Sequence, residues 1–174
     1  MSFVNDQATL PMAQDAAGGW CIPRAVEGRT ALLLARIGTV LAETGDERLS
    51  GAGVDGRDYS ILSILDTDGP GSQHELAFLL GKAPGVVVAA VDSLEERGLV
   101  ARTRDPADRR RTRVTVTKAG LKALAKADVL AEATVGEVLG GLDADERRQL
   151  DALLVKGLGP GLAAVAEPAA AARR

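Results

Sequence analysis

The chain has 174 residues, a formal net charge of −3, 46% hydrophobic residues and only 2% aromatic residues. This length fits one domain with tails, and a core of Leu, Val, Ala and Ile favours packed helices over a β-sandwich. With one cysteine and one histidine, an intramolecular disulfide and a Cys/His zinc site within one chain are both excluded. The sequence has no signal peptide and no membrane-length apolar run, so we expect a cytoplasmic protein with no membrane partner, metal or cofactor.

The sequence of the N-terminal part predicts a flexible arm followed by two helices. Residues 1–23 are small, polar and marked by Gly and Pro, and we expect a flexible arm. Apolar residues at helical spacing predict a helix over about 25–43, followed by a loop at 45–56. Asp55 is placed to cap a helix from Gly56 to about Asp66, which would bury three apolar or aromatic residues: Tyr59, Leu62 and Leu65.

The middle of the chain predicts a helix-turn-helix. Ser72 and Glu75 form a capping box that opens a short helix over 73–80, and Gly81 makes a tight turn. Pro84 is suited to the first position of a second helix, which Gly98 ends after Arg97. Its inward stripe is Val87, Val91 and Leu94. Two helices joined by such a turn are typical of DNA-binding proteins.

The run from Arg97 to Lys118 concentrates positive charge. It holds eight Lys or Arg residues against two acids, a net charge of +6, whereas the rest of the chain carries −9. Residues 99–104 and 112–117 have strand character, and Asp105-Pro106-Ala107-Asp108 supplies turn chemistry between them. We therefore predict a basic two-stranded wing that faces a polyanion. A charged hairpin that is merely solvated is the alternative.

The C-terminal part predicts two more helices. Residues 120–139 form the first, and Asp143 with Glu146 forms a capping box for the second, which Gly157, Gly159 and Pro160 end. Residues 159–174 are expected to be a flexible tail. The fold class is therefore mainly α with a small β-wing, and residues 24–158 form a single winged-helix domain.

Several motifs at fixed spacings resemble the MarR (multiple antibiotic resistance regulator) family of dimeric bacterial winged-helix transcription factors. They are Glu75-Leu76-Ala77, the run VDSLEERGLV at 91–100, DPADRR at 105–110, and VTKAG at 116–120. The resemblance covers roughly residues 25–158 and is most specific from Ser72 to Gly120. It implies a DNA-binding lobe over about 57–118 and dimerisation helices at 24–44 and 119–158.

The resemblance also implies a function and a set of site residues. The helix from Pro84 would enter the major groove, and the wing would reach the minor groove, with Arg110 inserted and Asp108 holding it. A homodimer would bind a pseudo-palindromic operator in double-stranded DNA as a repressor and would release it when a small apolar or anionic effector binds. The DNA-binding residues are expected to be Ser72, Gln73, Lys82, Gly85, Val86, Ala89, Ser93, Arg102, Arg104, Asp108, Arg109, Arg110, Arg111 and Arg113.

The recognition helix departs from the family pattern, which usually places Ser, Thr, Arg or Gln on its outer face. Here the outward positions are Gly85, Ala89, Asp92, Ser93 and Glu96, with Val86 and Val88 at the sides. None of these makes a bidentate base contact, and two are acids. Two readings stay open: contact with thymine methyl groups supplemented by wing and shape readout, or loose sequence preference.

Other function classes have weaker support. A protein–protein adaptor could use the apolar helix face but has no need for the arginines of the wing. No nucleophile–base pair suggests an enzyme. Cys21 could be an oxidant sensor, although an inert exposed thiol is the simpler reading. His74 fits a neutral surface residue, and a cavity lined by Leu, Val and Ala could hold the effector, with Arg29, Arg36 or Arg57 as counter-charges for an anion.

Overall fold

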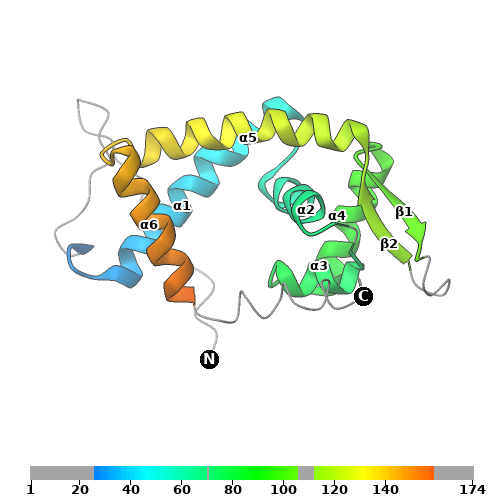
Figure 1. Ribbon diagram of the computed structural model, residues 1–174, viewed down its shortest axis with the longest axis horizontal. Coiled ribbons are helices and arrows are strands. Elements are labelled where there is room, and N and C mark those ends of the chain that lie inside the picture. Colours follow the sequence, from blue (N-terminus) through cyan, green and yellow to red (C-terminus); the bar gives the residue numbers. More distant parts are fainter. Residues whose placement is uncertain (1–25, 70, 106–111, 159–174) are drawn as a thin grey trace.

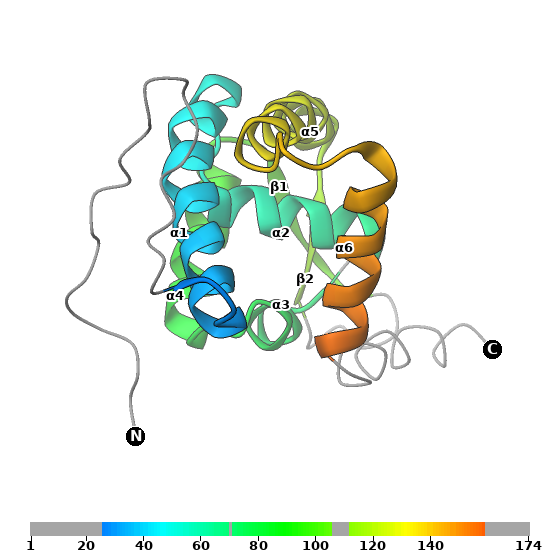
Figure 2. The same cartoon turned by 90° about the vertical axis from the view of Figure 1, so that its left-hand side faces the viewer.

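The computed structural model describes residues 26–69, 71–105 and 112–158. Its elements, in chain order, are α1 (Thr30–Leu49), the 3₁₀ turn η2 (Ser50–Ala52), α2 (Gly56–Thr67), α3 (Gln73–Leu79), α4 (Pro84–Glu96), β1 (Val100–Arg104), β2 (Thr112–Val116), α5 (Lys118–Val138) and α6 (Ala144–Leu158). The long helix α5 spans the molecule, with a winged lobe at one end and α1 and α6 at the other (Figure 1). Seen along that axis, α1 and α6 descend on opposite sides of α5 (Figure 2). The mainly helical fold with a small wing is therefore confirmed.

The hydrophobic core lies in the winged lobe. Its most buried side chains come from α2, α3, α4, both strands and α5. The three residues predicted to face inward from the recognition helix, Val87, Val91 and Leu94, are each 0% exposed. Leu62 and Leu65 are buried as expected, but Tyr59 is only half-buried because its hydroxyl reaches out to donate to Asp128 Oδ1 at 3.0 Å. Burial and this hydrogen bond raise the pKa of Tyr59 above its ordinary value.

The wing is an antiparallel pair that begins and ends one residue inside the predicted bounds. Val100 faces Val116 and Arg104 faces Thr112 in its register. Gly71 forms an additional bridge to Val114, with backbone hydrogen bonds of 3.2 and 2.8 Å. This bridge fixes the segment before α3 to the wing. The turn residues 106–111, including Asp108, Arg109, Arg110 and Arg111, lie outside the described residues.

The helix after the wing begins at Lys118, two residues earlier than predicted. Thr117 caps it, because the Oγ1 atom of Thr117 accepts from Gly120 N at 3.0 Å and donates to the carbonyl oxygen of Gly98 at 2.7 Å. Gly120 is therefore inside the first turn, where α5 crosses the end of α4. A Cβ atom at Gly120 would lie 2.1 Å from Leu99 O and 2.8 Å from Val116 Cγ2. The VTKAG motif thus sets a close approach between backbones.

The first helix differs most from its prediction. It begins at Thr30 instead of about 25 and continues through the predicted loop to Leu49. Gly45 does not end the helix, because α1 packs along α5 and Arg48 forms an ion pair with Glu137. Tertiary contact therefore outweighs the weak helix propensity of glycine. Residues 1–23, with Cys21, lie outside the described part of the chain.

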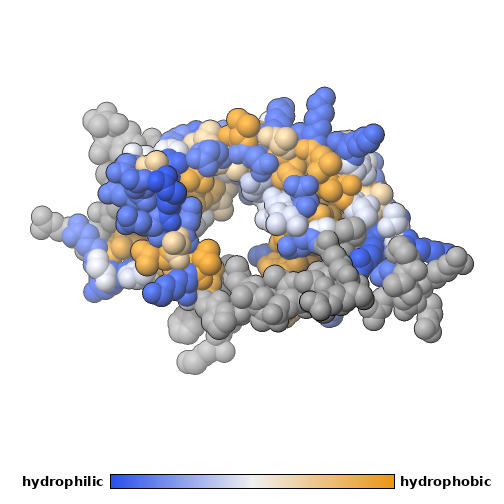
Figure 3. Space-filling model, viewed as in Figure 1, coloured by the Kyte–Doolittle hydropathy of each residue, from blue (hydrophilic) through white to orange (hydrophobic). Residues whose placement is uncertain are grey.

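The last helix is capped as predicted but stands apart. Asp143 Oδ1 accepts from Glu146 N at 2.9 Å, and Glu146 Oε2 accepts from Asp143 N at 2.8 Å. The helix α6 ends at Leu158, the last residue of the predicted domain, and the predicted tail at 159–174 is outside the described residues. No residue of α6 is buried. In Figure 3 apolar surface is visible near the lower ends of α1 and α6 as well as over α5 and the winged lobe.

None of the described helices is on its own both long and apolar enough to cross a membrane; α3 and α4 reach that composition and length only together, bent by 116°.

The contact at Gly120 gives a stability test. Replacing Gly120 with Ala forces the added methyl group against Leu99 O, and we expect the free energy of unfolding to fall by roughly 1–3 kcal/mol. Gly45→Ala is the matched control, because a Cβ atom at this helical glycine meets nothing within 4 Å. The Gly45→Ala variant should raise the free energy of unfolding by roughly 0.5–1 kcal/mol, because alanine favours a helix more than glycine does. Urea denaturation measures both, and equal effects would contradict the close approach.

Candidate nucleic-acid interface

Capping and turn residues set the ends of the two helices of the helix-turn-helix. Ser72 and Glu75 form the predicted capping box at α3: Ser72 Oγ accepts from Glu75 N at 3.2 Å, and Glu75 Oε2 accepts from Ser72 N at 2.7 Å. Gly81 adopts a φ of 59°, which glycine tolerates at little cost, and the chain turns directly into α4 at Pro84. Ala83, at the N-cap, offers no side-chain hydrogen bond to α4. The backbone N–H groups of the first turn of α4 are thus not covered by a cap.

The exposed side of α4 is apolar in its first half and acidic in its second. Val86 and Val88 are 40% and 38% exposed, and Gly85 and Ala89 are exposed between them. The second half exposes three polar or acidic residues: Asp92, Ser93 and Glu96. The predicted division of this helix into inward and outward positions is therefore confirmed.

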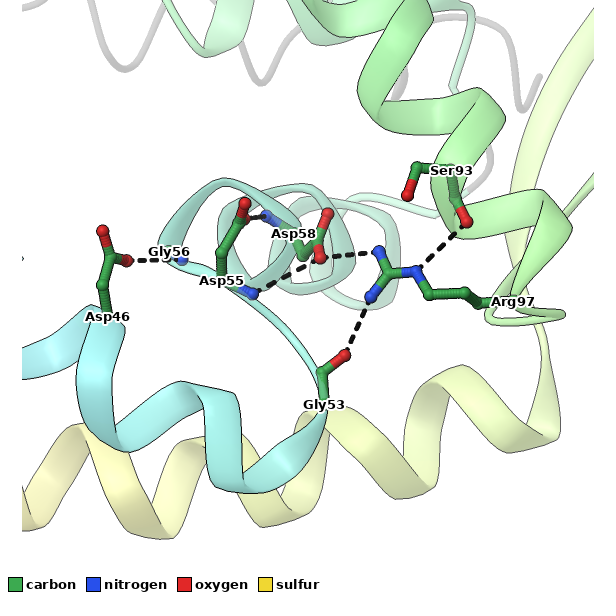
Figure 4. A network of polar contacts seen from close by, with 7 residues as sticks. All are labelled: Asp46, Gly53, Asp55, Gly56, Asp58, Ser93 and Arg97. Atoms are coloured by element: carbon green, nitrogen blue, oxygen red, sulfur yellow. Dashed lines mark hydrogen bonds and ion pairs between the residues drawn. The ribbon is translucent and has the colours of Figure 1, made fainter.

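Arg97 fixes the C-terminal end of α4 to the start of α2 (Figure 4). Its guanidinium donates to Asp58 Oδ2 at 2.6 Å, to the carbonyl oxygen of Gly53 at 2.8 Å and to that of Ser93 at 3.1 Å. Asp58 is 6% exposed and also completes the capping box of α2 with Asp55. A buried carboxylate needs such a partner, so Arg97 holds the recognition helix rather than a ligand.

Arg102, on β1, fixes the other side of α4 to the wing. Its guanidinium forms ion pairs with Asp92 and Glu95, and its backbone N–H donates to Glu95 Oε1 at 2.9 Å. This backbone hydrogen bond and the guanidinium lower the pKa of Glu95. The contribution of Glu95 to stability is therefore present at neutral pH and is lost as the pH falls through the folded-state pKa.

These ion pairs change the assignment of Arg102. The sequence predicted it as a DNA contact, but its guanidinium is occupied by two acids of α4. The same contact neutralises Asp92, which the sequence analysis had counted against DNA binding. Arg102 therefore joins the recognition helix to the wing in this structure.

Only part of the basic run remains available for a polyanion. Arg113, predicted as a phosphate contact, pairs with Asp105 at 2.8 Å, so it too is engaged within the wing. Among the basic residues of this run that the structure describes, Arg97 and Arg102 also have acidic partners. Arg104 is exposed on the same ribbon and forms no ion pair with the rest of the described chain.

The other predicted site residues lie around α3 and α4. Lys82, in the turn, is exposed and makes no ion pair within the described ranges. Ser72 uses its hydroxyl oxygen as a cap but keeps its hydroxyl proton. Gln73 turns inward, since its Nε2 atom is buried without a hydrogen-bond partner in the described structure. This geometry disfavours Gln73 as a direct DNA contact. His74 is exposed on α3.

A pocket of about 530 Å³ lies between the end of α1, the start of α2 and α4. Its lining is mixed in charge instead of the aliphatic lining that composition suggested, and Arg57 is the one of the three candidate anion-binding arginines that lines it. Ala89, Ala90 and Ser93 contribute its α4 side. Across the described residues, no three His, Cys, Asp or Glu side chains are grouped as a metal site.

Sequence reasoning missed the structural arginines. Arg97 was counted only as positive charge, and its buried partner Asp58 was not identified. A usable signal existed for Arg102: Asp92 and Glu95 are three residues apart, so they share one face of the helix next to the strand that follows it.

Comparisons with known proteins agree with this geometry. A sequence profile of the MarR family matches residues 57–112. The uncharacterized HTH-type transcriptional regulator YkoM of Bacillus subtilis (strain 168) is 30% identical over 99 residues, which are 57% of this chain and 64% of YkoM. The chain thus matches a little under two thirds of the length of that curated relative.

Two solved structures cover most of the chain. A MarR-family transcriptional regulator from Rhodococcus sp. RHA1 has a TM-score of 0.71 and 29% identity, over 79% of this chain and 98% of that one. CouR from Rhodococcus jostii RHA1, crystallised with p-coumaroyl-CoA, has a TM-score of 0.69 and 29% identity, over 79% of this chain and 97% of that one.

The fold is that of the winged helix-turn-helix proteins. Residues 57–112 match the MarR-family model, and the fold is similar to that of solved MarR-family regulators, so the resemblance drawn from the motifs is confirmed.

The role of Arg102 can be separated from phosphate contact. If Arg102 only joins α4 to β1, Arg102→Gln weakens duplex binding at every salt concentration and leaves the slope of log K against log salt unchanged. Arg104→Gln is the control and should reduce that slope by about one, because it removes an exposed charge. Fluorescence anisotropy over a salt series measures both. A slope reduced equally by the two variants would restore Arg102 as a phosphate contact.

Proposed function

We propose that this protein is a homodimeric transcriptional regulator that binds a pseudo-palindromic operator in duplex DNA. The observation that carries the proposal is the juxtaposition of the exposed side of α4 with a basic wing, held together by Arg102. Lys82 and Arg104 add positive charge on either side of α4. An α-helix of this kind fits the major groove, and the wing would then follow the neighbouring backbone or minor groove.

The α6 helix supports the homodimer. It has 15 residues but no buried side chain, and no helix of that length gains much stability in water by itself. Four leucines lie at helical spacing along one side, two of them 65% exposed: Leu150, Leu153, Leu154 and Leu158. The N-terminal half of α1 also exposes Leu32 and Leu34. A second copy that covers these faces would present two α4 helices to two half-sites.

The dimer can be tested through α6. Changing Leu153 and Leu158 to Glu puts charge on the leucine stripe without disturbing the core, and we expect a dimer-to-monomer shift with loss of operator binding. Val155→Glu is the matched control, because Val155 is 60% exposed but lies off that stripe. Light scattering should give twice the 18.0 kDa chain mass for the unmodified protein and the control. A dimer that persists in the double variant would contradict the assignment of α6.

We further propose that the dimer represses transcription and that a small molecule relieves repression. The likeness to CouR, which was crystallised with p-coumaroyl-CoA, supports ligand control. The pocket beside Ala89, Ala90 and Ser93 supports it as well, because an occupant there would contact the recognition helix. Its mixed lining, with Arg57 and three aspartates, favours a polar effector over a purely apolar one.

The wing arginines give the test of DNA binding. Replacing Arg109, Arg110 and Arg111 with Gln removes three charges, and we expect a loss of affinity of at least tenfold and a salt slope smaller by about two to three. Lys122→Gln is the control, since Lys122 is exposed on α5 and is not among the predicted DNA-binding residues. Gel shifts with the upstream region of the gene at several salt concentrations measure both. An unchanged slope in the triple variant would contradict the wing as a DNA contact.

The alternative function is a protein–protein adaptor. The exposed apolar residues of α3 and α4 favour it, because Phe78 is 71% exposed in addition to Val86 and Val88. An adaptor would retain its function in the triple arginine variant, and its duplex binding would be weak at every salt concentration.

A further inference from the structure

The first half of α4 presents a face without hydrogen-bonding side chains. Gly85 and Ala89 occupy its centre, and Val86 and Val88 flank them at 40% and 38% exposure. The first residues of a recognition helix are those that reach base edges. The part of this protein best placed to meet bases can therefore offer only methyl groups and backbone.

Glycine at position 85 permits a close approach. A Cβ atom there would meet nothing within 4 Å in the protein, so the absence of a side chain is not imposed by packing. Gly85 opens the outer surface of α4 next to the turn that carries Lys82. Because Gly85 has no side chain, the backbone of α4 can come close to the base edges at the floor of a DNA groove.

The surrounding charge favours duplex DNA over an apolar partner protein. Asp92 is paired with Arg102, so Glu96 is the one outward acid of α4 without an ion-pair partner in the described part of the chain. Exposed Lys82 lies before the helix, and exposed Arg104 lies on the wing beside it. An apolar strip with cations at both sides fits a groove floor between two phosphate backbones.

In the major groove the thymine C5-methyl group is the apolar group that distinguishes one base, whereas the other distinguishing groups are donors or acceptors. A donor or acceptor facing valine would lose its water without a replacement partner, which is unfavourable. On the basis of the proposed function, we infer that Gly85, Val86, Val88 and Ala89 read thymine methyl groups, so each operator half-site places thymines against this face of α4.

The test starts from duplexes that the full-length protein selects from a random pool. Each thymine of a selected site is replaced by uracil, which removes the methyl group and keeps the base pairing. We expect at least two positions per half-site where uracil weakens binding about fourfold, the effect of one buried methyl group. In the Val86→Ala/Val88→Ala variant, replacing thymine with uracil should change the affinity for the duplex little.

The control variant is Val129→Ala, which shortens a 70% exposed valine on α5 and should retain full sensitivity to uracil. Circular dichroism of each variant checks that α4 still folds. Binding that tolerates uracil at every position, or selected sites without thymine opposite α4, would overturn the inference and leave DNA binding intact. Failure to retain any duplex from the pool at low salt would overturn the proposed function and the inference together.

Discussion

Two arginine side chains fix the recognition helix, and the rest of the surface depends on them. Arg97 ties the end of α4 to the buried Asp58 of α2, and Arg102 ties its wing side to β1. Between these two attachments, the exposed side of α4 has one orientation relative to the wing. The helix has few polar groups of its own with which to orient itself on DNA, so this rigid placement substitutes for side-chain contacts.

The charge distribution follows from the same contacts. The basic run looks uniform in sequence, but its described residues fall into two groups: arginines that hold the lobe together, and the exposed Arg104 and Lys118. The structural arginines also neutralise acids that would otherwise repel phosphates, as Arg102 does for Asp92. The rest of the chain is acidic, so its positive charge is concentrated in this run.

Local chemistry made much of the fold predictable. The capping residues Asp55, Ser72 and Asp143 mark helix starts through hydrogen bonds within a few residues. Pro84 and Gly98 mark the two ends of α4 through their backbone conformations. The length of α1 was not predictable in the same way, because packing on α5 carries it past Gly45. The role of Gly120 also escaped, since the atoms that exclude a side chain there, in Leu99 and Val116, come from other elements.

The candidate site was predictable in outline and not in detail. The apolar face of α4 follows directly from helical periodicity. The partners of Arg97, Arg102 and Arg113 depend on which acids the fold brings beside them, and Asp58 lies 39 residues away in the chain from Arg97. Charge counting cannot distinguish an arginine that binds a ligand from one that completes an ion pair within the protein, so it did not reveal the acidic partners of these three arginines.

The central claim is that the exposed face of α4 lies against duplex DNA. The most direct measurement is the rate at which a maleimide modifies a cysteine placed at Ala89, in a Cys21→Ser background, with and without the selected duplex. If α4 lies in the groove, modification should be at least tenfold slower when the duplex is bound, and it should not change for a cysteine placed at Lys122 on α5. Equal modification rates at position 89 with saturating duplex bound would contradict it.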